Sequence, residues 1–315
     1  CENIDLNGAT VIPGFVDAHF HLVNLGKQLD NLQLKDCKSA SEIANLVLDK
    51  SSNLAETDWI FGFGWDHSRW IENEFPQADI LNNLNLKQPV VLTRIDGHSC
   101  WVNSVAMEMS GLNIEADPPE GGRIINNCIL IDNAMNPVTK LTPKSDAKTV
   151  EKWIKLALDI IIKRGITNIH DAWQEPVTID IIKKLDENND LPIRIYGMLG
   201  SRYNKLLDIF FKDGIYQSSR YTIRSVKAFI DGALGSRGAA LLESYADEPN
   251  NCGLILISAE KFKALARRCR DVGFQLCTHA IGDRGNQMVL DVYSDIIQNV
   301  KNHRWRIEHA QMVCD

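Results

Sequence analysis

The chain of 315 residues is long enough for two ordinary domains or for one large α/β barrel. Its 34 Lys and Arg against 41 Asp and Glu give a net charge of −7, which argues against a nucleic-acid-binding protein. The eight cysteines form no C-x-x-C pair, so the sequence holds neither a zinc ribbon nor a thioredoxin-like motif. Without an apolar run of 18 residues or a signal peptide, we expect a cytoplasmic protein with no membrane partner. Because the chain begins at Cys1, we also expect its native N-terminus to be missing.

The first predicted element is a strand in the apolar run that begins at Val11. Residues 34–147 break the pattern of alternating strands and helices, and we interpret them as a large insertion after that strand. The insertion contains Gly62-Phe63-Gly64, which lacks the third glycine of a dinucleotide-binding motif. Beyond it, β-α units repeat, with helices predicted at Thr149–Arg164, Val177–Asn188, Tyr203–Phe211, Ala259–Val272 and Gly285–Val300.

Strands of the main series are predicted to begin at Val11, Ile166, Ile193, Ile223, Gln275 and Arg306. Repeated β-α units imply a parallel sheet with helices on its outer face. The fold class is therefore α/β, a TIM-type (β/α)8 barrel. Such a barrel needs eight strands and the sequence supplies six, so we expect an incomplete barrel.

A candidate metal site starts with His19-Phe20-His21 at the end of the first strand. Residues at i and i+2 of a strand point to the same face, so both imidazoles can converge on one ion. Imidazole suits zinc and similar divalent metals. A His-x-His pair taken alone is more often a surface or packing pair.

Lys227 lies inside the predicted strand Ile223–Ile230. A lysine in a strand covered on both faces is unfavourable unless it is paired or chemically altered. A neutral lysine amine can capture carbon dioxide as a carbamate that bridges two metal ions. The alternative, about equally supported by the sequence, is an ion pair with Asp231.

His279 and His309 end two later strands. Side chains at the carboxyl ends of barrel strands line the active site in enzymes of this architecture. Each histidine alone would be a packing residue, whereas both together with His19, His21 and Lys227 favour a metal site.

These motifs together resemble the amidohydrolase superfamily, and in particular its amidohydrolase-3 branch of N-substituted formamide deformylase-like proteins. The resemblance covers nearly the whole chain. It is carried by Pro13–His21, by Lys227 with Phe229–Ser236, by Thr278–Asp283 and Glu308–Ala310, and by Asp96–His98 with Trp101–Ser104 in the insertion.

The resemblance implies that His19, His21, Lys227, His279 and His309 bind zinc or a similar divalent metal, as one or two ions, with Lys227 carboxylated if two bind. It implies hydrolysis of C–N bonds in a small-molecule amide or formamide, not a peptide, through a metal-bound hydroxide. The family's catalytic aspartate follows its eighth strand, which we expect to lie beyond Asp315, so no catalytic residue is assigned.

The resemblance also suggests how the chain is divided. Residues 1–10 would be a remnant of a small β-sandwich, and residues 11–315 the hydrolase barrel, with 34–147 inserted within it. We accordingly expect the 315-residue segment alone to be inactive and poorly soluble. The alternative function is a catalytically incomplete fragment that acts as a binding or regulatory module. The oligomeric state is not predicted.

Further polar residues are weaker candidates. His98 and Trp65 are predicted substrate contacts, although a loop histidine bonded to backbone and a core tryptophan are the alternatives. His170 and Asp171 are predicted to support the site without binding metal, and Asp283 to cap the helix that follows it.

Overall fold

The computed structural model describes residues 5, 7–97, 99–112, 118–119, 122–143, 145–234, 237–298 and 300–314. The chain divides into two compact units. The first is Cys1–Leu22 together with Ala157–Asp315, and the second is Val23–Leu156, which contains the whole of the predicted insertion. His98 lies outside the described residues.

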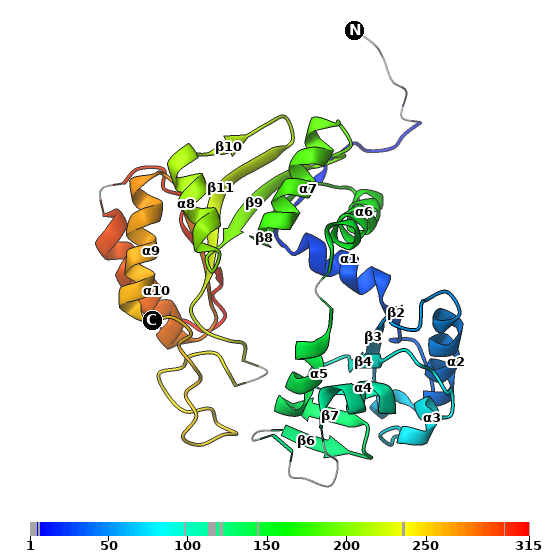
Figure 1. The fold of residues 1–315 in the computed structure, drawn as a ribbon. Coiled ribbons are helices and arrows are strands. Elements are labelled where there is room, and N and C mark those ends of the chain that lie inside the picture. The colour runs from blue at the N-terminus through cyan, green and yellow to red at the C-terminus, as the bar shows by residue number, and fades with distance from the viewer. Residues whose placement is uncertain are drawn as a thin grey trace. The chain divides into compact units, whose positions relative to one another are not determined.

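A parallel sheet in the first unit confirms the predicted α/β barrel architecture (Figure 1). Its strands follow in the order β1 (Phe15–Phe20), β8 (Ile166–Gln174), β9 (Arg194–Gly200), β11 (Tyr221–Phe229), β12 (Gln275–Ala280) and β13 (Arg306–His309). A short strand that the sequence did not predict, β10 (Tyr216–Gln217), pairs antiparallel with β11. The six main strands are those that were predicted.

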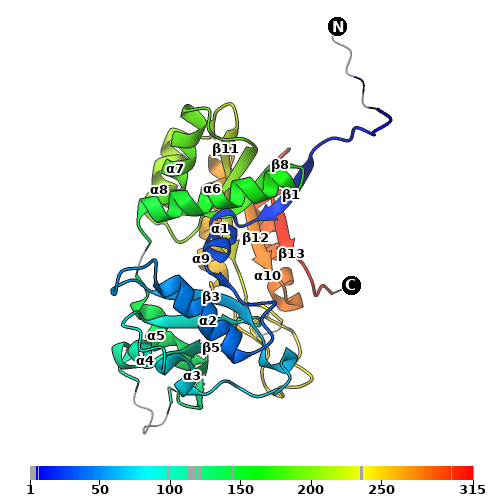
Figure 2. The ribbon, with the colours of Figure 1, turned by 90° about the vertical axis from the view of Figure 1, so that its right-hand side faces the viewer.

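Helices between these strands also match the prediction within a few residues. They are α6 (Ala147–Lys163), α7 (Pro176–Glu187), α8 (Asn204–Asp213), α9 (Ala259–Asp271) and α10 (Asp283–Ile297). In α9 the hydroxyl of Ser258 accepts the N–H of Lys261 and caps the helix. Its apolar face, which includes Phe262 and Leu265, is buried, and α9 and α10 pack against each other and against β12 (Figure 2). This amphipathic pattern is the reason that the sequence predicted the helices well.

The first strand begins later than predicted. Val11 and Ile12 are 72% and 61% exposed, and β1 starts only at Phe15. Phe15 pairs with Ile166, the first residue of β8, so the apolar residues before it have no strand beside them in the described structure. An apolar run becomes a strand only where a neighbour satisfies its backbone groups.

The second unit contains a mixed sheet that the sequence did not predict. Its strands follow in the order β2 (Leu32–Gln33), β3 (Ile60–Trp65), β4 (Val90–Arg94), β5 (Ser99–Val102), β7 (Ile129–Asp132) and β6 (Gly122–Ile125). Its helices are α1 (Leu22–Asp30), which begins at the last residue of the first unit, α2 (Ala40–Ser51), α3 (Ala78–Asn82), α4 (Ser104–Ser110) and α5 (Asn136–Leu141), with 3-10 turns at His67–Arg69 and Asn133–Met135. The segment is therefore a folded unit with its own core.

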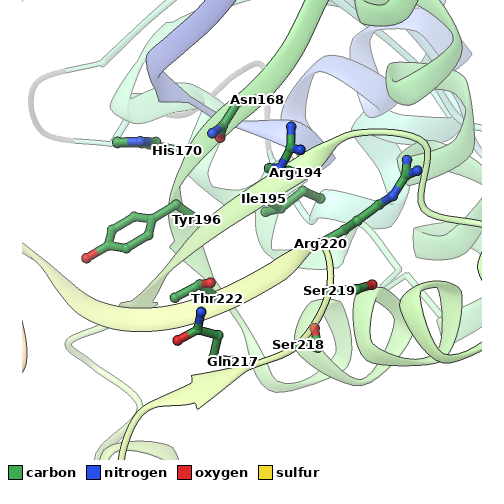
Figure 3. A pocket seen from close by; sticks show the side chains of 10 residues that line it. All are labelled: Asn168, His170, Arg194, Ile195, Tyr196, Gln217, Ser218, Ser219, Arg220 and Thr222. Carbon is green, nitrogen blue, oxygen red and sulfur yellow. The ribbon is translucent and has the colours of Figure 1, made fainter. Parts of the chain in front are cut away.

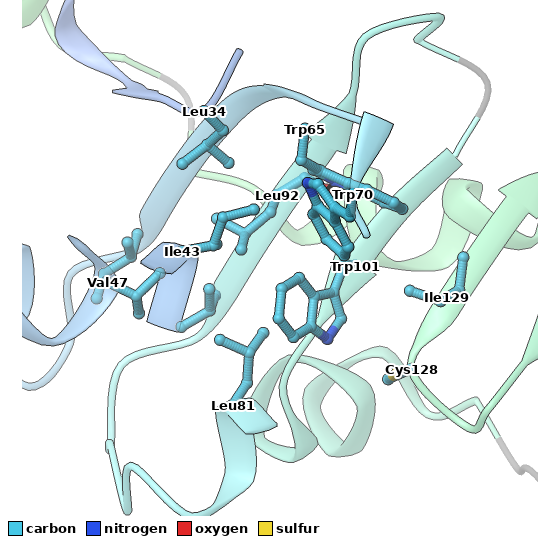
Figure 4. Packing of buried hydrophobic residues seen from close by; sticks show 12 residues of the cluster. Leu34, Ile43, Val47, Trp65, Trp70, Leu81, Leu92, Trp101, Cys128 and Ile129 are labelled. Carbon is cyan, nitrogen blue, oxygen red and sulfur yellow. Dashed lines mark hydrogen bonds between the residues drawn. The ribbon is translucent and has the colours of Figure 1, made fainter. Parts of the chain in front are cut away.

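Tryptophans dominate the core of this second unit (Figure 4). Trp65 and Trp101 are fully buried, with their rings 6.4 Å apart. A Cβ on Gly62 would lie 2.7 Å from Leu34 and 2.8 Å from Leu92. Gly64 adopts φ +104°, a conformation that favours glycine. Packing and backbone conformation thus explain the Gly-x-Gly pair without a dinucleotide.

None of the helices in the described part of the chain combines the length and the apolar character needed to cross a membrane.

Candidate functional site

The four candidate histidines lie at one edge of the parallel sheet. His19 is in β1 and His21 directly follows that strand, while His279 and His309 lie at the ends of β12 and β13. Register aligns the later strands, because Ala280 pairs with His309. Parallel strands present their carboxyl ends at the same edge, so these side chains meet there.

Ring distances confirm that the histidines form one cluster. The centroids of His19 and His21 are 5.2 Å apart, and those of His19 and His309 are 4.7 Å apart. His279 and His309 are likewise separated by 4.7 Å. Residues nearly 300 positions apart in the sequence therefore share one site.

His309 sits on an unusual backbone. Its φ is +76°, and that of the following Ala310 is +44°, both in the left-handed region that residues other than glycine rarely adopt. The N–H of Ala310 donates to the carbonyl oxygen of Ala280, 3.1 Å away, which ties this bend to β12. Such strained conformations concentrate at functional sites.

Burial holds two of the histidines in the neutral form. Burial, helped by the neighbouring histidines and Lys227, lowers the pKa of both His21 and His309 to about 4. A histidine must be deprotonated to bind a metal ion. Both side chains are therefore ready to act as ligands at neutral pH.

Lys227 is fully buried beside this cluster. Within the described residues its Nζ has no hydrogen-bond partner, and it lies 4.1 Å from the centre of the Phe229 ring. Burial lowers the pKa of Lys227 to about 8. Burying an amine without a polar partner is energetically unfavourable, and no such partner lies among the described residues.

The alternative ion pair between Lys227 and Asp231 is wrong. Asp231 instead accepts backbone N–H groups from Ala240, Ile281 and Gly282 at 2.8–3.0 Å, and its carboxylate lies 3.4 Å from Nε2 of His279. Although burial opposes ionisation, the hydrogen bonds that Asp231 accepts from His279 and from these backbone groups keep its pKa below the usual value. The carboxylate thus organises the loop after β11 and the end of β12.

Glu308 contributes a carboxylate that sequence analysis did not single out. Its Oε2 lies 2.6 Å from Nδ1 of His19, and its Oε1 accepts the Nε–H of Arg306 at 2.5 Å. Although burial opposes ionisation, these two partners lower the pKa of Glu308 to about 2. The side chain is therefore an anion at the edge of the histidine cluster.

The residues present fit a divalent metal ion. Four imidazoles form a donor set of the kind that zinc prefers, and Nε2 of one of them, His19, is buried without a hydrogen-bond partner among the described residues. As placed, no three His, Cys, Asp or Glu side chains within the described ranges are arranged to hold an ion. In this arrangement Nε2 of His279 lies 3.2 Å from the carbonyl oxygen of Gly232. The side chains would have to adjust to reach a common ion.

A third buried carboxylate, that of Asp171, contacts the residue next to His21. Asp171 accepts the N–H of Leu22, the residue after His21, at 2.9 Å, and the Nε2–H of Gln174, also at 2.9 Å. The hydroxyl of Tyr221 donates to the other end of Gln174 at 2.5 Å. The structural role expected for Asp171 agrees with these contacts, which extend from β8 to the turn after His21.

The remaining described candidates, Trp65, His170 and Asp283, are not members of the histidine cluster. Trp65 is a core residue of the second unit, and its Nε1 donates to the carbonyl oxygen of Leu92 at 2.6 Å. His170 accepts a hydrogen bond from Arg306 at 3.1 Å. Asp283 is not the N-cap of α10, which is Gly282; its carboxylate accepts the N–H of Leu242 at 2.9 Å and that of the adjacent Arg284 at 2.8 Å.

A polar pocket of about 270 Å³ lies near the amino ends of β8, β9 and β11 (Figure 3). Several of its polar groups already bond to the protein: Arg220 donates to the carbonyl oxygen of Leu191 at 3.0 Å, and Tyr196 to Gln275 at 2.7 Å. The catalytic end of a barrel is the carboxyl end of its strands. The histidine cluster, not this pocket, is the candidate active site.

The barrel-shaped parallel sheet matches that of metal-dependent hydrolases. An uncharacterized metal-dependent hydrolase from Pyrococcus furiosus superimposes with a TM-score of 0.76 at 26% identity, over 96% of this chain and 61% of that one. Residues 2–315 match the model of the Amidohydrolase family, and the chain belongs to that family.

Two curated relatives have similar sequences. Protein LONG AFTER FAR-RED 3 of Arabidopsis thaliana is 31% identical over 98% of this chain and 56% of its own length. N-substituted formamide deformylase of Arthrobacter pascens is 23% identical over 98% of this chain and 60% of its own length. The chain thus spans a little over half the length of these relatives.

Proposed function

We propose that this chain belongs to a metal-dependent hydrolase that cleaves C–N bonds of small non-peptide amides or formamides. The observation that carries the proposal is the meeting of four histidines and a buried lysine, without a hydrogen-bond partner among the described residues, at the carboxyl edge of a parallel sheet. The formamide class is supported by the similarity to N-substituted formamide deformylase of Arthrobacter pascens.

The proposed ligands are His19, His21, Lys227, His279 and His309, which hold zinc or a similar divalent metal as one or two ions. A bound divalent ion lowers the pKa of water to about 7 and polarises a carbonyl oxygen. His98, which lies outside the described residues, stays a predicted substrate contact. Trp65 is left out of the proposal because its side chain is fully buried in a core.

We further propose that Lys227 is carboxylated. Its neutral Nζ attacks carbon dioxide, a new N–C bond forms, and the amine loses a proton to leave an anionic carbamate. Burial supports this step, because the lowered pKa of Lys227 makes the neutral amine accessible near pH 8. The carbamate would supply the oxygen ligands that four histidines lack.

Metal content and substrate range test the proposal. After exhaustive dialysis, elemental analysis should find bound metal in the wild type and much less in a His19→Ala, His21→Ala double variant. His303→Ala, which changes a histidine of the same unit outside the cluster, is the control and should retain the metal. The metal-loaded full-length protein, and not the 315-residue segment alone, should hydrolyse N-alkyl formamides or non-peptide amides faster than peptides. Equal metal in all three proteins would contradict the assignment.

The alternative, a binding or regulatory module without catalysis, is less well supported. The residues of the proposed ligand set are all present, and the match to the Amidohydrolase family extends over residues 2–315.

A further inference from the structure

Two charged residues connect the outer strands of the parallel sheet. Among the described residues, β1 and β13 stand at opposite ends of the strand order, and each hydrogen-bonds along one side only. From β13, Glu308 reaches His19 at 2.6 Å, and an Nη2–H of Arg306 donates to the carbonyl oxygen of Ala18 at 2.9 Å. Both contacts end on neighbouring residues of β1.

Arg306 fixes the position of Glu308. The Nε–H of Arg306 donates to Oε1 of Glu308, while its Nη1–H donates to Nδ1 of His170 at 3.1 Å. The guanidinium is thus held by partners on β1, β8 and β13. Its planar set of donors pre-organises the carboxylate that it bonds.

The contact with Glu308 determines which nitrogen of His19 carries the proton. The ionised carboxylate can only accept, so Nδ1 of His19 must be the donor. In the neutral ring the proton then sits on Nδ1 and the lone pair on Nε2. That Nε2 is the buried atom for which the described residues provide no partner.

We infer that Glu308, held by Arg306, is a positioning residue that fixes His19 as the Nδ1–H tautomer and presents its Nε2 to the metal site. This inference rests on the proposed function for its metal part, but the tautomer can be measured without metal. Carboxylates that orient a metal-binding histidine typically contribute 10- to 100-fold in metal affinity or activity.

The test compares wild type with Glu308→Ala and Glu308→Gln. Long-range ¹H–¹⁵N NMR of the metal-free protein, with His19 assigned through a His19→Ala spectrum, should show Nδ1–H in the wild type. Glu308→Gln retains an acceptor and should retain that tautomer, whereas Glu308→Ala should lose it. Zinc affinity, measured by chelator competition, should fall about 10- to 100-fold in Glu308→Ala and less in Glu308→Gln.

The control is Asp208→Asn, which removes the carboxylate of an exposed ion pair with Arg268 in the same unit. Its zinc affinity and the His19 tautomer should equal those of the wild type. Circular dichroism of each variant identifies loss of fold, and the isosteric Glu308→Gln keeps the comparison valid if Glu308→Ala does not fold.

The outcomes separate the two ideas. If the wild type binds zinc and Glu308→Ala binds it equally, with His19 still Nδ1–H, the positioning role is overturned while the proposed function stands. If the wild type binds no zinc, the proposed function fails. The tautomer of His19 in the metal-free protein then tests the positioning role: loss of Nδ1–H in Glu308→Ala, but not in Glu308→Gln, would still support it.

Discussion

Lys227 illustrates how burial changes the chemistry of one side chain. The same residue type on the surface would be a permanently charged, solvated amine, but here it is fully buried and its pKa falls to about 8. The buried amine has lost its solvation and has no hydrogen-bond partner among the described residues, so its charged form is disfavoured. The neutral amine that is favoured instead can react with carbon dioxide.

Replacing Lys227 tests that role directly. In the metal-loaded, full-length enzyme we expect Lys227→Ala to lose bound metal and activity, by more than the roughly 10- to 100-fold that loss of a supporting residue causes. Short-chain carboxylic acids should restore part of the activity, because they can place a carboxylate in the vacated space. Lys227→Arg, which leaves no space, should not recover. Full activity of Lys227→Ala would show that the lysine is structural.

Asp171 gives a prediction about pH. Burial raises the pKa of this carboxyl to about 6 from an ordinary 3.8, so the folded chain binds its proton more tightly than the unfolded chain does. Its contribution to stability is therefore complete below about pH 3.8 and is lost as the pH rises to about 6. The shift corresponds to about 2–3 kcal/mol.

The measurement is the free energy of unfolding in urea between pH 4 and 7, for wild type and Asp171→Asn. The variant lacks this titration, so the wild type should lose stability relative to it as the pH rises. The difference between the unfolding free energies of wild type and variant is free of the contribution of His21 and His309. That contribution has the opposite pH dependence, because the pKa values of these histidines are lowered. A difference that does not change with pH would contradict the raised pKa of Asp171.

At the scale of secondary-structure elements, the second unit depends on the aromatic packing between β3 and β5. Trp101 on β5 is fully buried against Trp65 on β3. Truncating a buried tryptophan removes its transfer free energy and leaves a cavity.

We expect Trp101→Ala to lower the free energy of unfolding of the second unit by about 3–5 kcal/mol, and Trp101→Phe to lower it less. Ile71→Ala is the control, because Ile71 is 95% exposed and such surface changes stay within about 0.5 kcal/mol. Chemical denaturation followed by tryptophan fluorescence measures both. Equal stability of Trp101→Ala and Ile71→Ala would mean that this packing is not important.

At the scale of the whole molecule, the proposed ligands all belong to one of the two compact units. A metal ion that binds only the folded first unit stabilises that unit, by about 2.7 kcal/mol when the free metal concentration is 100 times Kd. That value corresponds to about 100-fold slower exchange in amides that exchange through opening of the first unit.

Hydrogen–deuterium exchange read by mass spectrometry checks this. Adding zinc should slow exchange in peptides from β11, β12 and β13 and leave peptides from β3 and β4 unchanged. The His19→Ala, His21→Ala variant should show no effect of zinc. Equal slowing in both units would contradict the confinement of the metal site to the first unit.

Local sequence patterns determined most of the first unit. The helices and the six main strands could be predicted because amphipathic periodicity, glycine and strand-end polar residues act over a few positions. The same patterns failed where an element depends on a distant neighbour. The true start of β1 at Phe15 follows from pairing with Ile166, and the mixed sheet of the second unit joins short strands that carry no clear period.

The sequence by itself also pointed to His19, His21, Lys227, His279 and His309, because each stands in a recognisable motif at a strand end or within a strand. Only the tertiary structure decided how they are supported. Glu308 and His19 are 289 positions apart and meet because the sheet curves. Asp231 accepts backbone N–H groups and does not bond Lys227, whose Nζ has no hydrogen-bond partner among the described residues. Residue types can be read from a sequence, whereas contacts between distant residues exist only once the chain has folded.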